Sequence, residues 1–279
     1  MKEDSGKDME QEKRLKDNLF KIKNKLIVIS GKGGVGKTSV AVNLAYGLSV
    51  KGYKVGILDV DIHGPNIAKM LGIEGRRSES SELGIEPVEV SSNLKAISIS
   101  FFVENQDTPI IWRGPRKMIT IKQFLSDVNW GYLDYLIVDS PPGTGDEPLS
   151  VCQLISDIDG AIIITTPQDV AILDSRKSVL FAKELKIPIV GIVENMSGFI
   201  CPHCQKEIDL FGAGGGEAAA HDLKVPFLGR IPIEPEMVKS GDSGKPLVGF
   251  KKENSTAKIV DEIIERIRRA LKTDEQEKI

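Results

Sequence analysis

The chain has 279 residues, of which 28% are charged and 41% hydrophobic, and its formal net charge is −3. This length is enough to bury a substantial core in one large or two small domains. The near-neutral charge argues against nucleic-acid-binding proteins as a class, and the chain has no apolar run of about eighteen residues that would span a membrane. Because the N-terminus also lacks a signal-peptide core and the three cysteines suit a reducing compartment, we expect a cytoplasmic protein that acts on neither nucleic acid nor membrane.

The two ends of the chain differ in composition from its centre. Residues 1–24 mix lysines with acids and carry few large apolar side chains, which predicts a charged arm that is mobile or partly helical. Residues 25–272 are predicted to form the main domain, and residues 273–279 a charged tail.

Within the main domain, short apolar runs typical of strands alternate with patterns typical of helices. This alternation predicts an α/β fold, with a mostly parallel sheet covered by helices on both faces. Residues 65–92 lack periodicity and are predicted to be an excursion from this domain. The expected strands are Leu26–Ile29, Val55–Leu58, Ala96–Ser100, Tyr135–Val138, Ala161–Thr165, Ile189–Val193 and Pro226–Leu228.

A complete phosphate-binding loop follows the first predicted strand and leads into a helical pattern over Ser39–Val50. Its glycines let the backbone wrap closely round a phosphate, so that N–H groups and the helix N-terminus point at negative charge. We expect Lys37 to reach the β- and γ-phosphates and the hydroxyl of Thr38 to bind Mg²⁺. The predicted nucleotide-binding residues of this segment are Gly31, Lys32, Gly33, Gly34, Val35, Gly36, Lys37, Thr38 and Ser39.

Three aspartates end predicted strands near this loop. Asp59 and Asp61 follow one apolar run and Asp139 follows another. Ligands of parallel α/β sheets gather at the carboxyl ends of the strands, so these acids are expected at the nucleotide. Asp139 suits the Mg²⁺ shell together with Thr38, Asp61 suits the orientation of the attacking water, and Asp59 is a further nucleotide-site candidate.

The loop, with its additional lysine at Lys32, resembles the deviant Walker A loop of the MinD/ParA/nitrogenase iron-protein class. In that class the ATPases form nucleotide sandwich dimers, so the resemblance implies a homodimer in which Lys32 acts on the partner's phosphates. Asn195 resembles the asparagine of the class that contacts the purine, and Pro232 lies in a segment like the one that packs beside the base. Because no N-K-x-D signature for guanine is present, ATP is favoured over GTP.

Cys201 and Cys204 form a C-x-x-C pair in the irregular segment 197–216. The spacing lets two thiolates reach one metal or one cluster, although the usual ligand number is four. Three interpretations stay open: two subunits share a Cys₄ site across a two-fold axis, the pair is a redox dithiol, or it binds zinc, alone or with His203. The shared site agrees best with the dimer implied by the phosphate loop.

Taken together, these motifs resemble the Mrp/ApbC family of iron–sulfur cluster carriers over about residues 22–271. The resemblance implies a P-loop ATPase domain whose homodimer holds a [4Fe–4S] cluster on Cys201 and Cys204 of each subunit. It further implies that ATP hydrolysis assists delivery of the cluster to apo iron–sulfur proteins. The segment Trp112–Pro115 also belongs to the resemblance, but its role is not assigned.

Two rival functions follow from the same class. A positioning ATPase like MinD or ParA would act on a membrane or DNA surface, and the apolar stripe with basic neighbours over Thr256–Leu271 is its best support. An electron donor like the nitrogenase iron protein is the third alternative. Its cysteines lie in separate loops, whereas Cys201 and Cys204 share one C-x-x-C.

Overall fold

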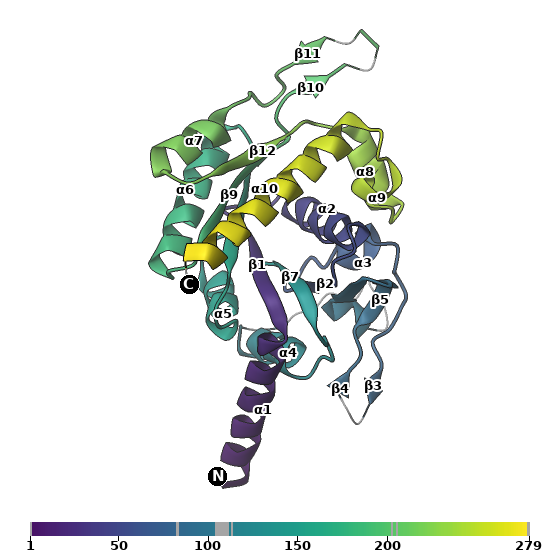
Figure 1. The fold of residues 1–279 in the computed structure, drawn as a ribbon, viewed down its shortest axis with the longest axis vertical. Coiled ribbons are helices and arrows are strands. Elements are labelled where there is room, and N and C mark those ends of the chain that lie inside the picture. Colours follow the sequence, from purple (N-terminus) through teal and green to yellow (C-terminus); the bar gives the residue numbers. More distant parts are fainter. Residues whose placement is uncertain are drawn as a thin grey trace.

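An eight-stranded sheet runs through the computed structural model, in the order β12-β9-β8-β1-β7-β2-β6-β5 (Figure 1). Its neighbouring strands are parallel except β5, which pairs antiparallel with β6 at the edge. The structure describes residues 2–81, 84–103, 112, 114–201, 203–204 and 206–277. The strands are β1 (Ile22–Ser30), β2 (Val55–Asp59), β5 (Val88–Ser91), β6 (Leu94–Ile97), β7 (Leu133–Asp139), β8 (Gly160–Thr165), β9 (Ile189–Asn195) and β12 (Phe227–Ile231).

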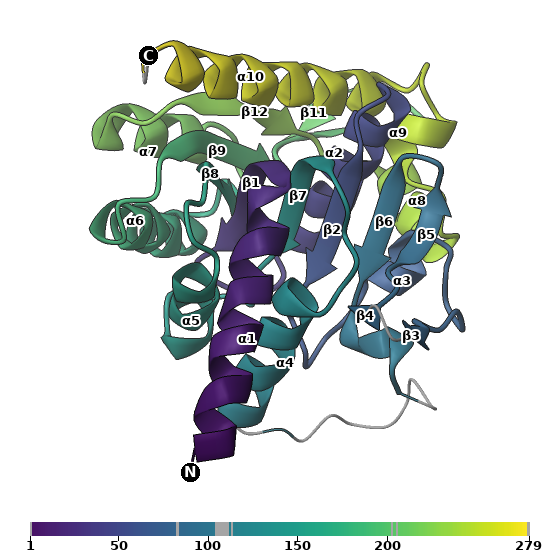
Figure 2. The same ribbon diagram turned by 60° about the horizontal axis from the view of Figure 1, so that its bottom comes forward.

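Helices cover both faces of this sheet, which confirms the predicted fold class (Figure 2). On one face lie α2 (Lys37–Val50), α3 (Ile67–Met70), α8 (Pro235–Asp242), α9 (Leu247–Phe250) and α10 (Ser255–Glu277). On the other lie α1 (Lys2–Phe20), α4 (Gly114–Ser126), α5 (Asp146–Leu154), α6 (Asp169–Glu184) and α7 (Gly215–Leu223).

The central strands are apolar on both sides because both of their faces are covered. In β1 the run Leu26–Ile29 is fully buried, and its side chains alternate between the two large core clusters on opposite faces of the sheet. At about 25 cal/mol per Å² of apolar surface removed from water, this two-sided burial is the main stabilising term for the sheet. It also holds the carboxyl end of β1, where the phosphate loop begins, in a fixed position.

Two of the segments predicted within the main domain differ in the structure. The expected strand Ala96–Ser100 ends at Ile97, because the hydroxyl of Ser98 accepts the backbone N–H of Ser100 (3.3 Å) and caps a 3₁₀ turn, η1 (Ile99–Phe101). The segment 65–92 contributes β5 to the sheet edge, as well as the short antiparallel pair β3 (Ser80–Ser81) and β4 (Gly84–Ile85).

The N-terminal segment, predicted as a mobile or partly helical arm, forms the continuous helix α1 along α4 (Figure 2). Leu19 is buried in the core, and the side-chain amide of Asn18 reaches the carbonyl oxygens of Leu125 (3.2 Å), Ser126 (2.9 Å) and Val128 (3.1 Å). These carbonyls lie at and just beyond the end of α4, where the helix cannot satisfy its own acceptors. Asn18 therefore joins the end of α1 to the end of α4.

A two-stranded ribbon projects from the sheet near the carboxyl ends of β9 and β12 (Figure 1). It is formed by β10 (Phe199–Ile200) and β11 (Glu207–Ile208), and we call residues 199–208 the cysteine hairpin. The backbone N–H of Cys201 donates to the carbonyl of Lys206 (2.9 Å) and continues the ladder to the tip.

The apolar stripe of α10 faces the protein interior. Val260, Ile263, Ile264 and Ile267 are buried in the core shared with α2. Within the described residues, the structure contains no helix with the length and apolar character needed to cross a bilayer.

Candidate functional site

The phosphate loop connects β1 to α2 and takes its shape from glycine conformations. Gly34 and Gly36 have φ angles of 82° and 83°, in the left-handed region that favours glycine, and Gly36 is the N-cap of α2. A Cβ atom on Gly36 would also lie 2.2 Å from the side-chain amide nitrogen of Asn195. The loop is therefore fitted closely to the end of β9.

A cavity of about 290 Å³ opens above this loop. It collects residues from the ends of β1, β2, β7 and β9, as expected for a ligand site at the carboxyl edge of a parallel sheet. It is lined by Ser30, Lys32, Gly33, Gly34, Gly36, Lys37, Thr38, Ser39, Asp61, Asn66, Met70, Pro142 and Met196.

Lys37, Thr38 and Asp139 form the polar centre beside this cavity. The ammonium of Lys37 donates to Oδ1 of Asp139 (2.5 Å), and the hydroxyl of Thr38 donates to Oδ2 of the same carboxylate (2.7 Å). The side chains of Lys37 and Asp139 are 6% and 1% exposed. A buried ion pair is tolerated when its polar atoms are bonded in this way, and the pair holds the ammonium of Lys37 beside the loop.

The donor set fits Mg²⁺. The hydroxyl of Thr38 and the carboxylate of Asp139 are hard oxygen ligands, held within 2.7 Å of each other at the N-terminus of α2. Asp61 lines the same cavity and adds a second carboxylate. The three residues come from the ends of three different structural elements, which the sheet brings together.

The two aspartates after β2 have different surroundings. Burial raises the pKa of Asp61, and the ammonium of Lys37 offsets part of this effect. Asp59 is 1% exposed, where burial and the nearby charge of Asp139 raise its pKa well above the ordinary value. Asp59 accepts the hydroxyl of Ser98 (3.1 Å) and the backbone N–H of Asp61 (3.1 Å), so the structure places it behind the cavity wall. Its contact with nucleotide stays a prediction.

Lys32 lies half-buried at the rim of the cavity. Its backbone carbonyl accepts the hydroxyl of Ser30 (3.0 Å), which fixes the backbone at this position. The adjacent Gly31 packs directly on the backbone of α6, because a Cβ there would lie 2.3 Å from the carbonyl oxygen of Asp174. The exposed apolar side chains of Val170 and Leu173 belong to the same helix.

The predicted base-contacting residues lie together at the ends of β9 and β12. Asn195 is 4% exposed and its amide donates to the carbonyl of Val35 in the phosphate loop (2.9 Å). It pairs in register with Ile231, which Pro232 follows. The purine contacts of Asn195 and Pro232 stay predictions, and the structure gives Asn195 a role in holding the loop.

Sequence reasoning missed five lining residues: Ser30, Met196, Pro142, Asn66 and Met70. Ser30 directly precedes the predicted residue Gly31. Pro142 and Met196 are each within three residues of a predicted site residue, Asp139 and Asn195. Met196 also has a φ of 57°, a conformation that a sequence pattern does not reveal. Asn66 and Met70 belong to the aperiodic excursion, where no pattern indicated a site.

The cysteine hairpin carries the second group of predicted site residues. Cys204 is exposed and Cys201 is half-buried at the tip. The backbone N–H groups of Cys204 and His203 bond to the sulfur of Cys201 and, with the thiol of Cys204, lower the pKa of Cys201. Such N–H bonds stabilise a thiolate, which is the form that binds metals. Among the described residues, no group of three or more His, Cys, Asp or Glu side chains is positioned to hold a metal within one chain.

Several large apolar side chains are exposed on the hairpin and just after it. They are Ile200, Ile208, Leu210 and Phe211, each at least 42% exposed. Singly exposed apolar residues are common, but a group on one projecting element indicates an interaction surface.

The surroundings of Cys152 and of the segment that begins at Trp112 indicate structural roles. Burial raises the pKa of Cys152 in α5 to about 12. The ring of Trp112 lies 4.5 Å from the guanidinium of Arg116 in α4. Lys117 is buried and pairs with Glu147 in the first turn of α5. Arg113 lies outside the described residues.

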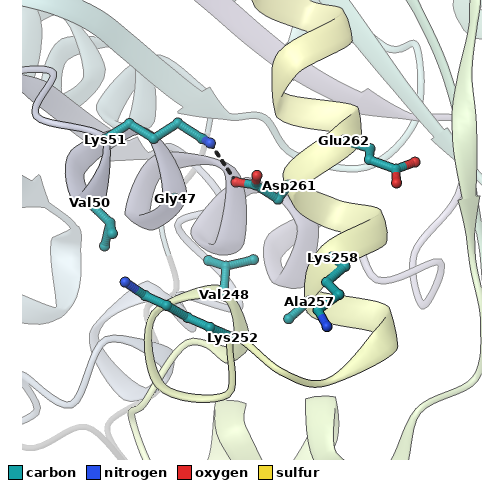
Figure 3. Close-up of a pocket in the computed structure, with 9 residues that line it drawn as sticks. All are labelled: Gly47, Val50, Lys51, Val248, Lys252, Ala257, Lys258, Asp261 and Glu262. Carbon is teal, nitrogen blue, oxygen red and sulfur yellow. Dashed lines mark ion pairs between the residues drawn. The ribbon is translucent and has the colours of Figure 1, made fainter.

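A larger cavity of about 540 Å³ lies away from the phosphate loop, between α2, α9 and α10 (Figure 3). Its charges are of both signs. Lys51 at its wall bonds to Asp261 (2.7 Å) and to Glu265 (3.1 Å), which joins α2 to α10. The cavity is therefore a crevice between packed helices, crossed by the ion pair of Lys51 and Asp261 (Figure 3).

Known proteins are similar to this chain in sequence and in architecture. A curated protein of Methanocaldococcus jannaschii named iron-sulfur cluster carrier protein is 52% identical over 260 residues, which cover 92% of this chain and 90% of that protein. A protein of the same name from Methanococcus maripaludis is 52% identical over 269 residues, 95% of this chain and 93% of that protein.

Solved structures of other proteins are also similar to this chain. A nucleotide-binding protein of Archaeoglobus fulgidus, described as a complex with ADP and with cobalt, superposes with a TM-score of 0.74 at 38% identity, covering 84% of this chain and 91% of that chain. The cell division ATPase MinD of Pyrococcus furiosus shares the fold, with a TM-score of 0.65 at 23% identity over 88% of this chain and 99% of that chain. The family model described as NUBPL iron-transfer P-loop NTPase, of the ParA group, matches residues 21–268. The chain therefore belongs to the family of NUBPL-type iron-transfer P-loop NTPases.

Proposed function

We propose that this protein is an ATP-binding and ATP-hydrolysing carrier of iron–sulfur clusters, which delivers its cargo to apo iron–sulfur proteins. The observation that carries the proposal is the pair of thiols on a ribbon projecting from a P-loop NTPase domain, with backbone N–H groups stabilising the thiolate of Cys201. The names of the relatives that are 52% identical support the same cargo.

The cluster is proposed to be a [4Fe–4S] cluster shared by a homodimer. Each chain supplies two thiolates, Cys201 and Cys204, and such a cluster takes four. Two chains related by a two-fold axis supply this number, because the same surface of each subunit meets at the axis. The exposed apolar side chains beside the hairpin support a contact between chains at this place. Because the hairpin projects from the domain, a site on it can also release its cargo while the sheet stays folded.

In the proposed ATPase cycle, the phosphate loop and Lys37 bind the phosphates of ATP. Thr38 and Asp139 would hold Mg²⁺, which would neutralise part of the phosphate charge when bound. Asp61 orients the attacking water, and Lys32 of each subunit stabilises the charge that develops on the nucleotide of the other. Hydrolysis is expected to be slow, because its role is to switch an interface.

The decisive experiment is anaerobic reconstitution with iron and sulfide, on the wild-type protein and the Cys201→Ala/Cys204→Ala variant. Visible absorption, iron and sulfide content and molecular mass are measured together. We expect about four irons per dimer in the wild type and loss of the cluster in the variant, which keeps its affinity for ATP. A variant that retained full iron and sulfide would overturn the ligand assignment, and a cysteine-dependent zinc content would indicate a zinc site instead.

The positioning-ATPase alternative loses its main structural support. The apolar stripe of α10 that it needs is buried against α2 and β12. Co-sedimentation with liposomes or DNA in the presence of ATP tests it directly, and nucleotide-dependent pelleting would favour it over the carrier.

A further inference from the structure

Glu194 is a fully buried carboxylate at the carboxyl end of β9, with a relative exposure of 0%. Its Oε1 accepts the backbone N–H of Gly214 (2.9 Å) and the hydroxyl of Ser197, and its Oε2 accepts the backbone N–H of Gly216. The guanidinium of Arg230 lies 3.4 Å from Oε1. A buried carboxylate is costly unless its charge is paired and its oxygens are bonded, so these partners hold it in one position.

These partners lie on both sides of the cysteine hairpin. Ser197 leads into the hairpin, whereas Gly214 and Gly216 lie beyond its exit, at the start of α7. The fit is close, because a Cβ on Gly216 would lie 2.9 Å from a carboxylate oxygen of Glu194. One side chain therefore fixes, relative to β9, the residue before the hairpin and the helix start that follows it.

The two residues after Glu194, which are the last residue of β9 and the one that follows the strand, reach the phosphate loop and the nucleotide cavity. Asn195 donates its amide to the carbonyl of Val35 in the phosphate loop (2.9 Å), and Met196 lines the cavity. Gly36 of the loop has no room for a side chain against Asn195. Three consecutive residues, 194–196, thus contact the residues that flank the hairpin on one side and the nucleotide cavity and phosphate loop on the other.

We propose that Glu194 is the positioning residue of the cysteine hairpin, through which nucleotide at the phosphate loop changes the exposure of the Cys201 and Cys204 thiols. A shift of the loop moves Asn195, and the buried bonds of Glu194 pass that shift to both ends of the hairpin. Coupling of this kind travels through bonded and packed groups that are in direct contact. The inference rests on the proposed function, since it assumes nucleotide at the loop and thiols that serve as ligands.

The test follows the rate at which the thiols of the metal-free, reduced, full-length protein react with N-ethylmaleimide, with and without Mg·ATP. A Cys152→Ala background restricts the signal to the hairpin. We expect Mg·ATP to change this rate about fivefold or more, in the range of ordinary coupling between sites. In Glu194→Gln, which removes the charge and replaces one acceptor by a donor, the change should fall below about twofold.

Glu217→Gln is the matched control. Glu217 is 56% exposed and pairs with the same Arg230, but it lies outside the buried cluster of Glu194. This variant should keep the full response to Mg·ATP. ATP affinity and melting temperature are measured for each variant, because a purely structural role would lower the melting temperature and leave the response unchanged.

A Glu194→Gln protein that responds to Mg·ATP like its parent overturns the inference, as do parent thiols that ignore Mg·ATP. If Glu194→Gln does not fold, Ser197→Ala decides. It removes one bond to the carboxylate and should reduce the response, whereas a full response there also overturns the inference. None of these results bears on the carrier proposal, which depends on whether Cys201 and Cys204 bind iron.

Discussion

Lys37 and Asp139 form a buried ion pair across the nucleotide site, with the ammonium nitrogen 2.5 Å from a carboxylate oxygen. The two residues are 102 positions apart in the sequence and meet because β1 and β7 are neighbouring parallel strands. The pair keeps the lysine inside the cavity wall, where the phosphates of a nucleotide would be bound.

Replacement of this lysine should abolish tight nucleotide binding. We expect Lys37→Ala to weaken ATP binding at least about 100-fold, through loss of roughly 3 kcal/mol of charge-assisted hydrogen bonding. Isothermal titration calorimetry with Mg·ATP measures the effect. Lys258→Ala, which removes an exposed lysine of α10, is the matched control and should bind like wild type. Equal affinities for the two variants would contradict the role given to Lys37.

Lys32 should act on the nucleotide of the partner subunit. We expect Lys32→Ala to bind ATP but to hydrolyse it at least about 100-fold more slowly, as in the loss of an arginine finger. A mixture of Lys32→Ala and Asp61→Asn proteins tests the action in trans, because one of the two sites in each mixed dimer is then complete. Such a mixture should recover roughly a quarter of the wild-type rate. No recovery would place Lys32 in its own subunit's site.

The three cysteines should differ in reactivity. Backbone N–H groups lower the pKa of Cys201, so at pH 8 it has a larger thiolate fraction than an ordinary thiol. Burial raises the pKa of Cys152 to about 12, which leaves on the order of one thiolate in ten thousand at pH 8. Alkylation with iodoacetamide followed by peptide mass spectrometry should find Cys201 modified first and Cys152 unmodified. The rate at Cys152 should rise up to about pH 12, whereas that at Cys201 levels off earlier; similar profiles would disprove this assignment.

The ion pair between α4 and α5 should respond unequally to the loss of either partner. The side chain of Lys117 is 8% exposed and that of Glu147 is 43% exposed. Glu147→Gln leaves a buried ammonium without its charge partner and should lower the free energy of unfolding by about 2–3 kcal/mol. Lys117→Met leaves a glutamate that water can reach, so its cost should be below about 1 kcal/mol. Urea unfolding of both variants gives the comparison, and equal losses would contradict the burial difference.

The parallel sheet and the phosphate loop could be predicted because their signals are local. Apolar runs such as Leu26–Ile29 indicate strands buried on both faces, and the loop from Gly31 to Thr38 carries its chemistry in consecutive residues. Asp139 could be placed beside Thr38 because strands of one sheet end at one edge.

Contacts of single side chains with distant backbone could not be predicted in this way. Asn18 at the end of α4 and Glu194 beneath the cysteine hairpin both satisfy backbone groups far along the chain. Such bonds leave no periodic pattern in a sequence, because they depend on where two elements meet after folding. For the same reason the end of β6 at Ile97 could not be predicted. The hydroxyl of Ser98 bonds to the backbone N–H of Ser100, and this local bond competes with the hydrogen bonds between neighbouring strands.

The cysteine hairpin has two paired residues in each strand and stands apart from the sheet core. So little of the chain's buried surface lies there that its residues contribute little to global stability. Substitutions at the tip are therefore nearly free of a folding penalty, and under the proposed function they can change the affinity for cargo while the ATPase core stays unchanged. The proposed cargo chemistry can then change independently of the stability of the fold.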